Sequence, residues 1–219
     1  MAQTSSIPGT ALIAAALILS LLVTLSLPFL PGLDIARVTV DIEGYESDQR
    51  MGIWSSCMYY TTGIHTCGPR EPGYEMEVYN VLNPSSSEVI TSAWTRGLVL
   101  HPIATAFILI AFLASLFVSN VIALLATSFA TCIASTAFIL DIVLYAHLHS
   151  IVKDANFGAA ASTSAGFWLS FASVVFLAIA GVVFHFARRR EIRSLKEASY
   201  PLQSKDGKHW ADKFKNSEF

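Results

Sequence analysis

The side chains whose chemistry could matter most begin with two cysteines. Cys57 and Cys67 flank the dipeptide Thr62-Gly63, which lies midway between them and is typical of a turn. A hairpin centred on that turn would place the cysteines opposite each other, as a cross-strand disulfide requires. The alternatives are two free thiols or a metal site, but a metal site needs more ligands and only His65 is near. We therefore predict a disulfide and no metal.

A histidine and an aspartate could carry proton chemistry. His101 and Asp141 each lie inside an apolar segment, where an ionisable side chain is costly and usually has a partner or a function. A carboxylate favours the charged imidazole whereas burial disfavours it, so a contact between the two would form a pair that responds to external acidity. In the alternative interpretation, Asp141 hydrogen-bonds a neighbouring segment or Arg96 and fixes helix register.

The elements that must position these residues are membrane helices. The chain has 219 residues, of which 53% are apolar and 14% charged, whereas soluble domains carry about 25% charge. The apolar residues form blocks of about 20, enough to cross a hydrocarbon core of ~30 Å as helix. We predict an all-α membrane protein, a bundle of four transmembrane helices at residues 8–30, 97–118, 121–146 and 164–186. A net charge of −2 argues against nucleic acid as a partner.

Basic residues predict the orientation. Residues 187–219 hold nine Lys and Arg against five Asp and Glu, whereas residues 31–95 hold three against nine. The tail, 187–219, and the N-terminus, 1–7, are therefore expected in the cytosol, and the loops 31–96 and 147–163 outside. A basic flank, Arg188, Arg189, Arg190 and Arg193, would attract anionic lipid of the bilayer, or serve simply as a stop-transfer signal.

The first outer loop is patterned as a small folded unit. Apolar residues alternate with polar ones around Val38 and again around Val78, which predicts β-strands with one buried face. Together with the cysteines, this predicts a small disulfide-bonded β-sheet in the loop. Small residues at 14–16, 130–135 and 159–166 are expected to allow close helix approach and to leave surface for lateral association, including a homo-oligomer.

Several motifs resemble a known family. Gly52-Ile53-Trp54, the two cysteines and Arg96 are similar to the claudin-type four-span pattern. Ser26-Leu27-Pro28, the segment from Trp94 to His101-Pro102, and the segment from Phe138 to Leu144 around Asp141 resemble the fungal PalI family, relatives of the four-span eisosome proteins. The resemblance covers about residues 5–186.

The resemblance implies a multi-pass plasma-membrane protein that assists a multi-span sensor in the fungal response to ambient, alkaline pH. An eisosome-type organiser of membrane domains that affects the cell wall is the alternative within the family. A channel or transporter is a third hypothesis, and it predicts polar residues along a path through several spans. The sequence contains no nucleophile with its base, metal cluster or phosphate-binding loop, so we expect neither an enzyme nor a cofactor.

Overall fold

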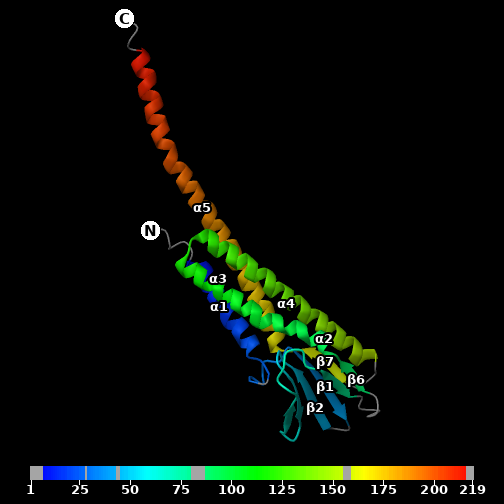
Figure 1. Ribbon diagram of the computed structural model, residues 1–219. Coiled ribbons are helices and arrows are strands. Elements are labelled where there is room, and N and C mark those ends of the chain that lie inside the picture. The colour runs from blue at the N-terminus through cyan, green and yellow to red at the C-terminus, as the bar shows by residue number, and fades with distance from the viewer. Residues whose placement is uncertain (1–6, 28, 43–44, 80–86, 155–158, 216–219) are drawn as a thin grey trace.

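The computed structural model describes residues 7–27, 29–42, 45–79, 87–154 and 159–215. It is a bundle of long helices with a small β-sheet unit at one end (Figure 1). In these residues, four helices are long and apolar enough to cross a membrane: Ile7–Thr24, Ser92–Phe117, Asn120–Lys153 and Ala165–Lys196. The start of the first helix and the long extension of the last lie at the end opposite the sheet (Figure 1). The four-helix membrane bundle with an attached sheet is therefore confirmed.

The helices differ in length from the predicted spans. Helix α1 (Ile7–Thr24) ends in turns rather than continuing to residue 30, and α4 (Asn120–Asp154) runs eight residues beyond residue 146. Helix α5 (Ala165–Lys215) continues through most of the tail. The second span is built from α2 (Ser92–Thr95), the 3₁₀ turn η1 (Arg96–Val99) and α3 (Leu100–Phe117). Pro102 lies in the first turn of α3, where its missing N–H leaves no hydrogen bond unmade.

The main sheet has five antiparallel strands in the order β4-β3-β2-β1-β7. Four of them follow one another between the first and second membrane helices: β1 (Ala36–Ile42), β2 (Tyr45–Met51), β3 (Ser56–Tyr60) and β4 (His65–Cys67). The fifth, β7 (Ala159–Thr163), comes from the segment between α4 and α5 and pairs with β1, with Val38 opposite Ala161. The prediction that these small residues serve helix packing is therefore wrong, because they extend the sheet instead.

A hairpin covers part of this sheet. It consists of β5 (Met76–Tyr79) and β6 (Ser87–Ile90), which form a separate two-stranded sheet. The buried residues of the hairpin, the sheet and the outer extension of α4 form one core: Val38, Met51, Met76, Val78, Ile90, Leu144, Leu148 and Val152, among others. Burying each large side chain contributes about 1.5–3 kcal/mol. This core fixes the sheet against α4.

The bundle core is built largely of alanine. Ala16, Ala104, Ala111, Ala123, Ala130 and Ala180 are at most 2% exposed, and they pack with a few larger side chains. One of the larger ones is Phe184, whose ring would lie 2.9 Å from a Cβ placed on Gly9. Small side chains let the helix backbones approach closely, which supplies the packing that holds helices together in lipid.

The segment Gly52-Ile53-Trp54 joins the sheet to the end of α1. The Trp54 indole donates to the carbonyl of Thr24 (2.8 Å), and the backbone N–H of Ile53 donates to the hydroxyl of Ser26 (3.0 Å). Gly52 lies so close to α1 that a Cβ there would meet the Cβ of Leu27 at 2.5 Å. We call these contacts the joint. They satisfy a terminal helix carbonyl and explain why α1 ends at Thr24.

Tyr74 is hydrogen-bonded to the joint. Its hydroxyl donates to the carbonyl of Gly52 (2.7 Å), and the hydroxyl of Thr95 donates to the carbonyl of Tyr74 (2.6 Å). Burial raises the pKa of Tyr74, because the phenolate would lose its hydration. The phenol therefore keeps its proton, and its hydrogen bond to Gly52, in alkaline surroundings.

The disulfide between Cys57 and Cys67 closes the β3–β4 hairpin, as predicted. Replacing Cys57 with serine should lower the free energy of unfolding by about 3 kcal/mol, because the unfolded loop is no longer restricted. Thermal unfolding of the purified protein measures this. Cys132→Ser is the matched control, since Cys132 is an exposed free cysteine. Equal stability of the two variants would contradict the structural role of the bridge.

Gly52→Ala should destabilise the protein by about 1–3 kcal/mol, because the new methyl group overlaps the side chain and backbone of Leu27. Gly32→Ala is the control, since no atom lies within 4 Å of a Cβ at Gly32. Chemical or thermal unfolding of both variants gives the comparison. A Gly52→Ala protein as stable as Gly32→Ala would show that the joint is looser than these distances indicate.

Candidate functional site

His101 and Asp141 meet at the centre of the bundle. The Nε2 atom of His101 on α3 lies 3.0 Å from Oδ1 of Asp141 on α4. The two residues are 5% and 0% exposed, so the contact is shielded from bulk water. Among the described residues, the carboxylate forms no ion pair with Arg96. The structure thus brings the two predicted residues together, while their response to pH stays a prediction.

Hydroxyl groups extend this contact to α1. Thr105 lies one turn after His101 and donates to its carbonyl (2.9 Å). The Thr105 hydroxyl also lies 2.6 Å from that of Ser20 and 2.9 Å from that of Thr24. These five residues form what we call the polar cluster. It links three of the four membrane helices inside a bundle whose buried residues are mostly apolar.

A small cavity adjoins the polar cluster. Its volume is about 10 Å³, roughly that needed by one water molecule, and its lining includes Ser20, His101, Ser170 and Ser173. The buried Oδ2 atom of Asp141 and the hydroxyl of Ser170 have no hydrogen-bond partner among the described residues. The imidazole therefore borders a small space between the four helices that is lined by serine hydroxyls together with alanine and valine side chains.

The arrangement joins two ionisable side chains, an imidazole and a carboxylate, by one hydrogen bond inside the bundle. Ionisable side chains within membrane spans are costly and usually have a partner or a function. Within the described part of the chain, no group of three or more His, Cys, Asp or Glu residues is placed to hold a metal ion.

One face of the sheet carries a row of charged side chains that the sequence analysis missed. The Arg37 guanidinium lies 3.2 Å from buried Asp34 and 3.5 Å from Asp48, which also pairs with Arg50 (3.1 Å). Arg50 in turn lies over the ring of Tyr59, 4.3 Å from its centre. Hydrogen bonding to Asp34 raises the pKa of Arg37, which therefore stays charged at alkaline pH. The pairing of β1 with β2 brings Arg37 next to Asp48 and so joins two local ion pairs into one row.

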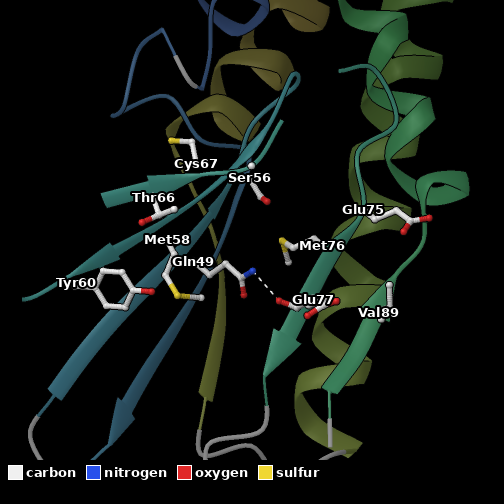
Figure 2. Close-up of a pocket in the computed structure, with 11 residues that line it drawn as sticks. Gln49, Ser56, Met58, Tyr60, Thr66, Cys67, Glu75, Met76, Glu77 and Val89 are labelled. Carbon is white, nitrogen blue, oxygen red and sulfur yellow. Dashed lines mark hydrogen bonds between the residues drawn. The ribbon is translucent and has the colours of Figure 1, made fainter. Parts of the chain in front are cut away.

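The other face of the sheet forms a cleft against the β5–β6 hairpin. Figure 2 shows Gln49 and Met58 on the sheet and Met76 on β5 facing the space between them. The amide of Gln49 donates to the carbonyl of Glu77 (2.9 Å), drawn as a dashed line. The cleft has a volume of about 380 Å³, and Tyr60 and Thr66 complete its rim. We call it the outer cleft.

The remaining predicted residues lie apart from the polar cluster. Arg96 is exposed, and its stem packs against Gly73, which has a positive φ of 79°. Snorkelling along the surface describes it better than pairing with Asp141. The basic flank belongs to the part of α5 that follows the predicted fourth span, 164–186, at the end of the bundle opposite the sheet (Figure 1).

Comparison with known proteins agrees with this structure. A model of the SUR7/PalI family matches residues 5–180, which contain the joint, the disulfide and the polar cluster. A search of curated proteins finds none of significant similarity. The family consists of non-enzymatic membrane proteins. With its four membrane helices and its disulfide-bonded outer sheet, the chain belongs to the SUR7/PalI family of multi-pass membrane proteins.

Proposed function

We propose that this protein is a non-catalytic auxiliary component of the alkaline-pH response in the plasma membrane, where it packs laterally against a multi-span sensor. Family membership supports the membrane role. The observation that carries the pH role is the buried contact between His101 and Asp141. Both ends of the chain face the cytosol in this proposal.

Two features support that orientation. The basic flank lies at the end of the bundle opposite the sheet (Figure 1), and basic residues beside membrane spans favour the cytosolic side. The disulfide lies at the sheet end, and disulfides persist in oxidising, extracellular surroundings. The sheet unit is then exposed to the medium whose pH is to be reported.

The mechanism is a change of charge within the polar cluster. In acidic medium the imidazole holds a proton, and its positive charge compensates the carboxylate of Asp141. Alkaline medium removes that proton, and the neutral imidazole can still donate a hydrogen bond but no longer supplies the positive charge that compensated the buried carboxylate, which the low dielectric of the bundle penalises. The packing of α3 against α4 then loosens, and the surface presented to the sensor changes.

Few other groups near the polar cluster could compensate that charge. In the described structure, α1 and α5 contribute hydroxyls to its surroundings, namely those of Ser20, Thr24, Ser170 and Ser173. The histidines of α4 lie farther out, where His147 stacks on Trp94 with ring centres 3.9 Å apart. The pair therefore depends on its own proton.

Cells that lack the protein test the proposal at its broadest. We expect growth and pathway activation to fail at alkaline external pH and to remain normal at acidic pH. A fluorescent marker of plasma-membrane patches should keep its distribution. Normal alkaline growth with dispersed patches would contradict the proposal and favour an organiser of membrane domains.

His101→Gln tests the mechanism. Glutamine can still donate a hydrogen bond to Asp141, but it cannot take up a proton, so pathway output should no longer differ between acidic and alkaline medium. His149→Gln is the matched control, because His149 is exposed on the outer part of α4. Pathway activation is measured at equal protein levels. An unchanged response of the His101→Gln cells would sink the mechanism.

A further inference from the structure

A groove runs along the lipid-facing side of the bundle, at the end opposite the sheet. Helix α4 contributes Leu124, Ser128 and Thr131, and α5 contributes residues between Leu177 and Phe186. The volume of the groove is about 560 Å³. A Cβ placed on Gly181 would meet no atom within 4 Å, so the backbone of α5 is open to an occupant there. We call this the α4–α5 groove.

The floor of the groove suits hydrocarbon. The hydroxyls of Ser128 and Thr131 donate to carbonyls of their own helix, at 2.8 and 2.7 Å, and so need no outside partner. The remaining lining is apolar apart from His185. Along α5 the groove spans Leu177 to Phe186, which is about 14 Å at 1.5 Å per residue. That is close to half of the ~30 Å hydrocarbon core, the depth of one leaflet.

The end of the groove nearest the tail is polar and basic. His185 is exposed there, and its imidazole makes no hydrogen bond to the described residues. Ala178, Val182, His185 and Arg189 follow at intervals of four, three and four residues, so they share one face of α5. The nearby carboxylate of Glu191 accepts a hydrogen bond from Asn120 of α4 (3.3 Å). The cationic side chain of Arg189 therefore lies on the same face of α5 as the residues that line the groove.

We propose that the α4–α5 groove binds a phospholipid with an anionic headgroup. One acyl chain lies along Gly181, and the headgroup phosphate contacts His185 and Arg189. The length of the groove favours this occupant over a transmembrane helix, which would need a surface across both leaflets. The charge at its end selects anionic over zwitterionic headgroups. This site is separate from the polar cluster and does not depend on the pH role.

Native mass spectrometry of the full chain tests the site, after release from nanodiscs of phosphatidylcholine with phosphatidylserine. We expect phosphatidylserine to be retained in preference to phosphatidylcholine. Gly181→Leu fills the groove and should abolish retention of both lipids. Thr136→Leu is the matched control, because Thr136 is an exposed residue of α4 outside the groove. Retention by Gly181→Leu equal to that of Thr136→Leu would overturn the proposal.

Arg189→Gln tests headgroup selection and does not fill the groove. The preference for phosphatidylserine should fall about fivefold, the equivalent of ~1 kcal/mol per basic residue at a membrane surface. Arg190→Gln is the charge-matched control, since Arg190 is turned about 100° around the helix from Arg189 and lies at the margin of the face of α5 that lines the groove. Equal preference in both variants would mean that the flank attracts lipid without a defined site. If Gly181→Leu instead changed only the oligomeric state, a protein helix would occupy the groove and the lipid proposal would fail.

Discussion

The rest of the structure depends on how the backbone at the end of α1 finds its hydrogen bonds. The last carbonyl groups of a helix have no hydrogen-bond donor within the helix. The Trp54 indole donates to one of these carbonyls, that of Thr24. Because Gly52 has no side chain, the sheet can approach Leu27 closely enough for that bond to form. The joint thereby sets where the sheet stands on the bundle, and the buried Tyr74 holds it in place.

The sheet is also tied to the helices at several further points. Strand β7 ties the second outer loop to the first, and the outer extension of α4 packs its apolar face on the same core. Gly166 at the start of α5 donates to the carbonyl of Asp34 (2.9 Å), so the fourth span is tied to the sheet as well. A shift between α3 and α4 would therefore also displace residues that pack against the sheet.

The bundle beneath the sheet combines close packing with a costly polar group. Alanines bring the helices near enough for the polar cluster to bridge α1, α3 and α4. In such surroundings a charged side chain without a partner is strongly unfavourable, and His101 and Asp141 are each other's hydrogen-bond partners. The inner end differs, because there the α4–α5 groove opens to lipid beside a basic helix.

The sequence by itself determined the features that depend on local pattern: four apolar helices, alternating strands around Val38 and Val78, and the turn that pairs Cys57 with Cys67. The placement of His101 and Asp141 inside apolar helices also followed from the sequence. Only the tertiary structure decided that Ala159–Thr163 forms a strand, because small residues have no pattern of their own and β1 offers the open edge. It also decided the contact of Arg37 with Asp48, the outer cleft and the α4–α5 groove, since each joins residues from elements whose spacing no local pattern records.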